Sequence, residues 1–391
     1  MLIHFEGGNA FVVQNADGMG QTDRIGGAQK LFHGRNDMWR LRNCRWHGNA
    51  LGQKRGVGMG VNENVLKPLD RLSQALAGEM EAVNALIRQR MASKHAPRIP
   101  EVTAHLVEAG GKRLRPMLTL AAAKLLGYPG DYHVHLAATV EFIHTATLLH
   151  DDVVDESQQR RGRPTANLLW DNKSSVLVGD YLFARSFQLM VEPGNLRTLE
   201  ILSNASAVIA EGEVLQLSAA QDLRTDEAIY LQVVRGKTAA LFSAATEVGG
   251  VIAEASEEQV RALFDYGDAL GIAFQIVDDL LDYGGATETI GKNVGDDFRE
   301  RKLTLPVIKA VAQADQAERD FWTRVIEKGD QRDGDLEHAL DLLARHGAMD
   351  AARADALDWA GRAKSALSVL PEHPIRDMLS DLADFVVSRV A

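Results

Sequence analysis

Two aspartate-rich segments are the residues of this chain best suited to chemistry. They share the spacing Asp-Asp-x-x-Asp and comprise Asp151, Asp152, Asp155, Asp278, Asp279 and Asp282. In an α-helix the first and last aspartate of each set lie one turn apart on one face, so each set forms a carboxylate cluster. Oxygen-only clusters suit Mg²⁺, which commonly binds through one or two carboxylates plus substrate phosphates. The spacing therefore predicts a Mg²⁺ site for a phosphorylated substrate, with all of these aspartates as candidate metal ligands.

A solvated helix face or a capping region is the alternative for any single segment of this kind. Here, however, both sets interrupt apolar runs, with Leu148 and Leu149 before the first set and Leu280 and Leu281 within the second. Carboxylates among such side chains are costly unless a cation holds them. The two copies together favour carboxylates that line an interior cavity.

Two basic segments bracket the first aspartate set. Gly-Gly-Lys-Arg-Leu-Arg-Pro precedes it at 110–116, and Arg-Arg-Gly-Arg-Pro-Thr follows it at 160–165. Lysine is a point charge, arginine is a planar fork for phosphate oxygens, and glycine lets the backbone approach an anion. Either segment alone is typical of a solvated patch, but their position in an acidic chain predicts diphosphate binding. Weaker candidates for the same task are Lys237 with Thr238, Lys292 and Lys302.

A histidine precedes the first aspartate set by two helical turns. His144 is seven residues before Asp151, so its ring can reach the same cavity as a hydrogen-bond donor. A buried histidine with its hydrogen bonds satisfied is the competing interpretation.

The first aspartate set must be carried by a helix, expected from about His133 to Glu156. Its stripe has residues at steps of three and four, namely Leu136, Val140, Ile143, Thr147, Asp151 and Asp155. One face thus joins an apolar wall to a metal-binding end. The second expected helix has a related face, formed by Gly271, Gln275, Asp278 and Asp282, where glycine leaves space. Both faces fit a substrate with an apolar tail and a charged head.

Composition limits the class of protein. A hydrophobic content of 46% with only 10 prolines favours a helical globular protein. The net charge of −11 argues against a general nucleic-acid binder, because surplus Lys and Arg hold phosphate backbones. No apolar stretch reaches about 18 residues, so a soluble protein without a transmembrane helix is expected. Cys44 is the single cysteine, which excludes an internal disulfide framework and fits a cytoplasmic protein.

The chain is expected to have two parts. Residues 1–58 hold 11 of the 34 glycines and 8 Lys/Arg against 4 Asp/Glu, whereas the remainder is acidic. This segment is interpreted as a disordered extension, a targeting segment, or the product of a start codon placed too far upstream. Residues 59–391 read as helix after helix and are expected to form one all-α domain.

Taken in order, these segments resemble the trans-isoprenyl diphosphate synthases, or polyprenyl synthetases. The resemblance covers residues from about 64 to 391 and rests on GGKRLRP, both aspartate sets, the trailing RRGRPT, Lys237-Thr238 and GKNVGDDFRERKLTLP. It implies a helical bundle around a central cavity, a homodimer, and Mg²⁺-dependent transfer of a prenyl group from an allylic diphosphate, such as farnesyl diphosphate, to isopentenyl diphosphate. One departure is Arg301, where the family usually has glycine before Lys302, and this change is expected to perturb the loop that closes over the site.

The resemblance also implies roles for individual residues. Mg²⁺ bound by Asp151, Asp155 and Asp278 would stabilise the negative charge that develops on the leaving diphosphate. The allylic diphosphate would be held by Arg160, Lys237, Thr238 and Gln275. Isopentenyl diphosphate would be held by Lys112, Arg115, His144 and Arg161. Lys292 and Lys302 remain further substrate-binding candidates.

Product length is expected to depend on the helix that carries the first aspartate set. In short-chain members of the family a bulky aromatic near the fifth residue before the first aspartate blocks the growing chain. Here that residue is Ala146, with Thr147 beside it and Ile143 one turn earlier. An open tunnel predicts a product of octaprenyl to decaprenyl length, as in the synthases that supply the ubiquinone side chain.

Three other functions are weighed against this one. A shorter-chain, geranylgeranyl-type synthase differs only in the tunnel. A class I terpene cyclase usually has Asn, Ser or Thr and Glu in its second metal motif, where this chain has a second aspartate set. A non-catalytic regulatory subunit is expected to have lost carboxylates or basic groups that are intact here.

Overall fold

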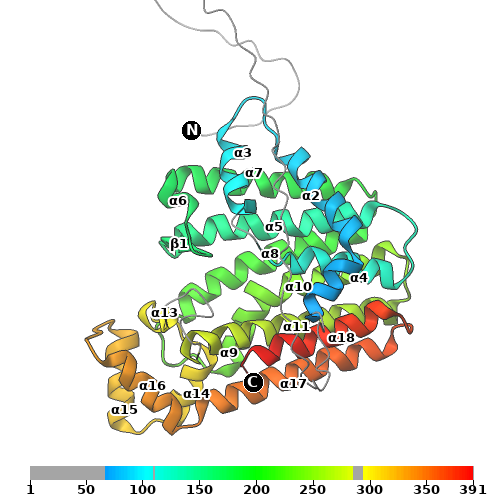
Figure 1. Cartoon of the computed structure of the whole chain (residues 1–391). Coiled ribbons are helices and arrows are strands. Elements are labelled where there is room, and N and C mark those ends of the chain that lie inside the picture. Colours follow the sequence, from blue (N-terminus) through cyan, green and yellow to red (C-terminus); the bar gives the residue numbers. More distant parts are fainter. Residues whose placement is uncertain (1–66, 109–110, 285–293, 391) are drawn as a thin grey trace, which may run out of the picture. The chain divides into compact units, whose positions relative to one another are not determined.

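The structure, a computed structural model, describes residues 67–108, 111–284 and 294–390. The predicted extension 1–58, its boundary with the following domain and Lys292 lie outside the described residues. The described chain is a bundle of helices with one two-stranded antiparallel hairpin (Figure 1). The predicted all-α fold class is therefore confirmed.

The first half of the described chain contains α1 (Pro68–Ala75), α2 (Ala77–Met91), α3 (Arg98–Glu108), α4 (Leu114–Leu125), α5 (Tyr132–Val154), β1 (Gln159–Arg160), β2 (Arg163–Pro164), α6 (Ala166–Leu169), α7 (Asn172–Val191) and α8 (Leu196–Ala219). The second half contains α9 (Glu227–Val234), the π-helical turn η1 (Arg235–Ala239), α10 (Ala240–Ile252), α11 (Glu257–Gly284), α13 (Asp296–Arg299), α14 (Leu305–Gln313), α15 (Gln316–Trp322), the π-helical turn η2 (Thr323–Glu327), α16 (Asp335–Arg345), α17 (Ala348–Ala366), the 3₁₀ turn η3 (Leu367–Val369), α18 (Pro374–Val387) and the 3₁₀ turn η4 (Ser388–Val390).

Helix α5 carries the first aspartate set and packs against α7, α4, α2 and α10. Its core residues Leu136, Val140 and Ile143 are fully buried, as the apolar stripe predicts. The helix ends at Val154, because Asp155 serves as the C-cap and donates its N–H to the Asp151 carbonyl at 2.8 Å. The predicted helix is confirmed, with its end two residues earlier than expected.

Helices α9 and α10 form one helical run that is interrupted by the π-helical turn η1. This turn meets α8 at two glycines. A Cβ on Gly236 would lie 2.7 Å from the Gly212 Cα, so no side chain larger than hydrogen fits between the two backbones. Because Gly236 packs on Gly212, the next residue, Lys237, lies close to α8.

Helix α11 carries the second aspartate set and packs on α17 and α10. From the sequence, Gly271 is expected to leave space for an apolar tail, but the structure differs. A Cβ at Gly271 would lie 2.6 Å from the Ala239 Cα and 3.2 Å from the Phe242 Cβ. The space at this glycine is occupied by the neighbouring helical run, so Gly271 serves close helix packing.

The C-terminal ends of α5 and α11 lie toward the same end of the bundle. The β1–β2 hairpin follows α5 there, and α13 lies beside the end of α11 (Figure 1). Both aspartate sets are therefore carried to one end of the fold. Among the described helices, none has the length and apolar character needed to cross a membrane.

Candidate active site

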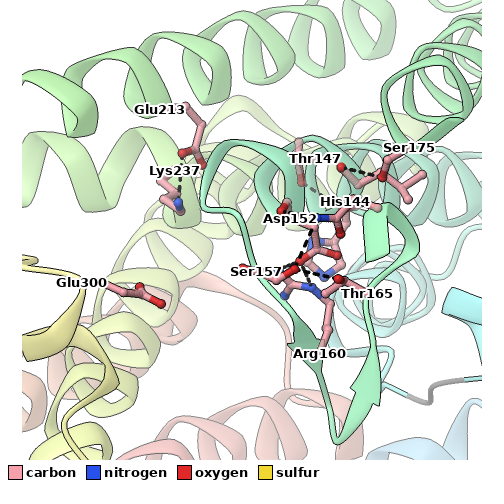
Figure 2. A network of polar contacts seen from close by, with 12 residues as sticks. His144, Thr147, Asp152, Ser157, Arg160, Thr165, Ser175, Glu213, Lys237 and Glu300 are labelled. Carbon is pink, nitrogen blue, oxygen red and sulfur yellow. Dashed lines mark hydrogen bonds and ion pairs between the residues drawn. The ribbon is translucent and has the colours of Figure 1, made fainter. Parts of the chain in front are cut away.

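The first aspartate set divides into exposed and buried members. Asp151 and Asp155 are partly exposed, whereas Asp152 is fully buried. Arg160 of strand β1 holds Asp152, with Nη2 at 2.7 Å and Nε at 2.8 Å from Oδ1 (Figure 2). The Asp152 carbonyl also accepts the N–H of Ser157 at 3.0 Å. The middle aspartate therefore fastens the hairpin to the end of α5.

Asp151 lies in an environment that resists its ionisation. Burial raises the pKa of Asp151 to about 7, and the nearby carboxylates of Glu213 and Asp155 add to this effect. Lys237 acts in the opposite direction. A cation bound at this position would stabilise the ionised form of Asp151, so the carboxylate chemistry fits a metal ion.

Lys237 is held by a residue that the sequence analysis missed. Its Nζ lies 2.9 Å from Oε2 of Glu213, which extends from α8 (Figure 2). The only sequence signal is an acidic residue directly after Gly212 in a mainly apolar helix. Because Glu213 also raises the pKa of Asp151, this pair borders the first aspartate set.

The second aspartate set divides in the same way. Asp278 is exposed, whereas Asp279 is only 5% exposed. Asp279 accepts hydrogen bonds from the Tyr230 hydroxyl at 2.6 Å and from Gln275 Nε2 at 2.8 Å. The Thr238 hydroxyl in turn donates to Gln275 Oε1 at 2.8 Å. The structure thus brings Thr238 and Gln275 together as expected, and it adds Tyr230, which the sequence analysis missed.

Asp282, the last member of the second set, connects α11 to the segment that follows. Its Oδ2 accepts the Asp297 N–H at 3.0 Å, and its carbonyl accepts the Gly295 N–H at 2.9 Å. Although burial acts against the charge of Lys302, the carboxylates of Asp297 and Glu300 raise its pKa. Lys302 is also within electrostatic reach of Asp155 and Asp279, so it lies between the two aspartate sets.

Arg301 has a backbone conformation that glycine adopts more readily. Its φ of 60° is in the left-handed region, where glycine is favoured because it has no Cβ. The preceding helix α13 ends there, with the Arg301 N–H bonded to the Phe298 carbonyl and the Lys302 N–H bonded to the Asp297 carbonyl. Arg301 adopts the conformation that a glycine would supply, and Lys302 keeps its contacts with acidic neighbours.

A cationic pocket lies between α3, the N-cap of α4, α5 and the hairpin. Its lining comprises His105, Leu106, Arg113, Glu141, His144, Thr145, Leu148, Arg160, Arg161, Pro164 and Thr165. His144 Nε2 lies 3.3 Å from Arg115 Nη1, and burial together with the adjacent arginines lowers its pKa well below the ordinary value. His144 is therefore neutral near pH 7, and since Nε2 faces a donor, Nδ1 carries the proton.

Arg161 lines this pocket, and Arg115 lies behind its wall against His144. Arg115 stacks on Phe242, with its guanidinium carbon 4.5 Å from the ring centroid, and burial lowers its pKa to about 10. The Arg161 guanidinium lies so close to Gly111 that a Cβ on Gly111 would be 2.6 Å from Arg161 Nη1. Lys112 is exposed and lies within electrostatic reach of Asp278. Arg115 and Arg161, both expected to bind isopentenyl diphosphate, thus come together around His144.

Glu141 and Arg113 also line the pocket. Their ion pair was not expected from the sequence. Arg113 forms an ion pair with Glu141 and has a left-handed backbone, with φ of 48°. Burial raises the pKa of Glu141 although Arg113 and Arg115 oppose this shift. Three arginines, Arg113, Arg160 and Arg161, stand against this one glutamate in the lining, so the pocket is cationic.

The residues expected to govern product length lie on α5. Ile143 and Ala146 are fully buried, and Thr147 is half-buried with its hydroxyl donating to the His144 carbonyl at 2.9 Å. Ala146 provides the smallest side chain of the three. The structure places all of them in the turns that precede Asp151, as the sequence predicts.

The donor set fits a hard divalent cation that is completed by a substrate. Among the described residues, no three Asp, Glu, His or Cys side chains converge on a preformed metal cage. The exposed or partly exposed members of the two sets, Asp151, Asp155, Asp278 and Asp282, offer oxygen donors only. Mg²⁺ characteristically keeps waters and shares its ligands with substrate phosphates, so an incomplete carboxylate set agrees with its chemistry.

Known proteins match both the sequence and the fold. The family model described as polyprenyl synthetase matches residues 96–343. Octaprenyl diphosphate synthase of Escherichia coli (strain K12) is 44% identical over 321 residues, which cover 82% of this chain and 99% of that protein. The crystal structure of a decaprenyl diphosphate synthase from Rhodobacter capsulatus is 77% identical, with a TM-score of 0.81, covering 83% of this chain and 100% of that chain.

A third relative was solved with ligands. Polyprenyl synthase from Caulobacter crescentus CB15, complexed with calcium and isoprenyl diphosphate, is 53% identical with a TM-score of 0.79, covering 83% of this chain and 98% of that chain. The family match includes both aspartate sets and both basic segments. The chain belongs to the polyprenyl synthetase family and is a prenyltransferase.

Proposed function

We propose that this protein is a long-chain all-trans polyprenyl diphosphate synthase that adds isopentenyl diphosphate units successively to an allylic diphosphate, up to octaprenyl or decaprenyl length. The observation that carries the proposal is the arrangement of opposite charges. Two aspartate sets at one end of the bundle adjoin the cationic pocket around His144, and Lys112 lies within electrostatic reach of Asp278. A metal-bound diphosphate and a second, metal-free diphosphate can therefore be held side by side.

Members of the family use a divalent metal, and we propose Mg²⁺ for this protein. When bound, Mg²⁺ would neutralise the charge that develops on the departing diphosphate. Asp151, Asp155 and Asp278 would hold it, and the buried Asp152 and Asp279 would hold the backbone that carries these ligands. Release of Lys237 from Glu213 would let its ammonium group bind the allylic diphosphate together with Thr238 and Gln275.

The second substrate fits the cationic pocket. Arg115, Arg161 and Lys112 would bind the diphosphate of isopentenyl diphosphate, and Nδ1–H of neutral His144 would donate a further hydrogen bond. Arg160, which the resemblance assigns to the allylic diphosphate, lies at the wall of this pocket, where Asp152 holds its guanidinium. This arrangement would orient the isopentenyl double bond toward the allylic carbon.

The reaction then needs no protein nucleophile. The allylic C–O bond breaks, and the departing diphosphate takes both electrons. The isopentenyl double bond attacks the resulting carbocation and forms the new C–C bond. The released diphosphate, held beside the new cation, is the proposed base that removes a proton and leaves a double bond in the lengthened chain.

Product length provides a prediction about α5. Because Ala146 is small and fully buried in the turn before Asp151, we expect Ala146→Phe to block the path of the growing chain and shorten the product without abolishing turnover. Ala146→Leu should give intermediate lengths, and Ala146→Gly should not shorten the product. Chromatography of the dephosphorylated products measures this series, and an unchanged distribution in the phenylalanine variant would refute the role of Ala146.

We also propose a homodimer that is formed through α7 and α8. Both helices carry large apolar side chains on their exposed faces, namely Val176, Leu177, Phe187 and Val191 on α7 and Val214 and Leu217 on α8. Monomeric proteins rarely leave apolar surface of this kind uncovered. A second copy of the same chain would cover these two helices by symmetry.

The activity is tested with the purified full chain, farnesyl diphosphate, labelled isopentenyl diphosphate and Mg²⁺. We expect labelled lipids of octaprenyl to decaprenyl length. A product that stops at geranylgeranyl length would indicate a short-chain synthase, unlabelled cyclic hydrocarbons would indicate a terpene cyclase, and no product would indicate a regulatory subunit. Asp151→Asn serves as the control, because loss of a metal ligand should sharply reduce the rate, most clearly at limiting Mg²⁺.

A further inference from the structure

Tyr230 is a buried tyrosine whose hydroxyl forms a hydrogen bond with Asp279 of the second aspartate set. It lies on α9 and is only 5% exposed. Its hydroxyl donates to Asp279 Oδ2 at 2.6 Å, while Gln275 Nε2 donates to Asp279 Oδ1 at 2.8 Å. Each oxygen of this buried carboxylate thus has a donor, so Asp279 is held from two sides.

The contacts of Tyr230 belong to a closed chain of polar side chains between two helical runs. Tyr230 and Thr238 stand on the run formed by α9 and η1, whereas Gln275 and Asp279 are one turn apart on α11. The Thr238 hydroxyl donates to Gln275 Oε1 at 2.8 Å and closes the chain. Two hydrogen-bonded connections therefore fix the rotation of α11 against α9 and η1.

The chain also determines how Gln275 presents its amide. Asp279 Oδ1 accepts from the NH₂ group of Gln275, so the amide oxygen of Gln275 faces the Thr238 hydroxyl. The neighbour of Asp279 in sequence, Asp278, is exposed on α11. Holding Asp279 in place thus fixes the orientation of Gln275 and the direction of Asp278.

We propose that Tyr230 is a positioning residue for the metal and the allylic diphosphate, acting through Asp279 on Gln275 and Asp278. The inference rests on the proposed function, because it concerns the same site. Tyr230 itself touches neither substrate nor metal in this account. Groups that orient metal ligands from behind commonly affect metal affinity by roughly 10–100-fold.

The test is Tyr230→Phe, which removes one oxygen and leaves the ring. Calorimetry with inorganic diphosphate and Mg²⁺ should show binding weakened about tenfold or more. In steady-state assays the KM for the allylic diphosphate and the half-saturating Mg²⁺ concentration should rise. The KM for isopentenyl diphosphate should stay within about twofold of wild type, because Arg115 and His144 stand on α4 and α5.

A matched control is available on α11. Tyr266 is fully buried, and its hydroxyl donates to the Leu379 carbonyl at 2.9 Å. Tyr266→Phe removes the same atom and one buried hydrogen bond, but it leaves Asp279 untouched. Both variants should lower Tm, and only Tyr230→Phe should weaken the binding of Mg²⁺ and inorganic diphosphate.

A second variant keeps the inference testable if Tyr230→Phe does not fold. Asp279→Asn replaces one accepting oxygen by NH₂, so the side chain loses at least one of its two donors. Asp279→Asn should weaken the binding of Mg²⁺ and diphosphate as Tyr230→Phe does. The double variant should bind within about twofold of Asp279→Asn alone, because both changes act on the same contact.

Two results would overturn the role of Tyr230. The first is a Tyr230→Phe variant that binds Mg²⁺ and inorganic diphosphate as tightly as the wild type. If Tyr230→Phe does not fold, the second is an Asp279→Asn variant that binds both as tightly as the wild type. Absence of prenyl transfer by the wild-type chain would instead contradict the proposed function, since the calorimetric comparison does not depend on turnover.

Discussion

Neighbouring aspartates within each set occupy different environments. Asp152 is fully buried against Arg160, and Asp279 is buried against Tyr230 and Gln275, whereas Asp151 and Asp278 are accessible. Successive side chains on a helix point roughly 100° apart. One of two adjacent aspartates therefore faces the protein interior when the other faces the site. This geometry gives the repeated Asp-Asp pair two tasks, holding the local structure and offering a ligand.

The raised pKa of Asp151 predicts a pH dependence of Mg²⁺ binding. The ionised form binds the cation, and with a pKa of about 7 the group is mostly protonated below that pH. Each bound Mg²⁺ then displaces a proton, so affinity should fall by about tenfold per pH unit below 7 and become nearly constant above it. Calorimetry across this range, at fixed inorganic diphosphate, measures the effect.

Glu213→Gln is the comparison for this pH profile. The variant removes a repulsive carboxylate and frees the charge of Lys237, and both changes lower the pKa of Asp151. The decline in Mg²⁺ affinity should therefore begin at a lower pH than in the wild-type chain. Profiles that superimpose would show that Asp151 does not control metal binding.

The residue types of the site could be predicted from the sequence, but their partners could not. The resemblance to the polyprenyl synthetases implied that Thr238 and Gln275 belong to one site, and the structure joins them by a hydrogen bond. Tyr230 and Glu213 were missed because a single tyrosine or glutamate in a helical segment is usually an ordinary packed or solvated residue. Their importance arises from tertiary contacts with Asp279 and Lys237, which no local pattern encodes.

At the scale of elements, η1 positions Lys237 and Thr238. A π-helical turn shifts the register of the side chains that follow it. Here the turn begins at Arg235 and places Gly236 directly on Gly212 of α8. Lys237 consequently reaches Glu213 on α8, while Thr238 faces Gln275 on α11. The sequence pattern did not indicate this turn, because the close packing of Gly236 on Gly212 is a tertiary contact.

This packing predicts the effect of Gly236→Ala. The added Cβ would lie 2.7 Å from the Gly212 Cα, so α8 and η1 must separate. We expect a loss of about 1–3 kcal/mol in the free energy of unfolding and a higher KM for the allylic diphosphate, because Lys237 and Thr238 move. Denaturant unfolding and steady-state kinetics measure the two effects.

Gly361→Ala is the matched control on another helix. Gly361 is exposed within α17 and nothing lies within 4 Å of an added Cβ, so the substitution should stabilise the protein by about 1 kcal/mol. Its kinetics should equal those of the wild type. If both alanine variants had the same stability, close packing at Gly236 would not be the reason for its glycine.

At the scale of the whole molecule, the sequence predicted one all-α domain with aspartate sets that line an interior cavity. It could do so because long helices with apolar faces must bury those faces against one another. The detailed packing was less accessible. Gly271 was expected to leave space, yet a neighbouring helical backbone fills it. Sequence periodicity identifies which face is buried, whereas only the fold determines what covers that face.

The proposed homodimer can be tested by placing a charge on α7. Leu177 on α7 is 66% exposed, and Val214 on α8 is 65% exposed, so a charge on either helix should disrupt a symmetric contact. We expect light scattering to give the mass of two chains for the wild type and of one chain for Leu177→Asp. Leu357→Asp, which alters a leucine that is 51% exposed on α17, should remain dimeric. A wild-type mass of one chain, or a Leu177→Asp variant that stays dimeric, would contradict an interface through α7.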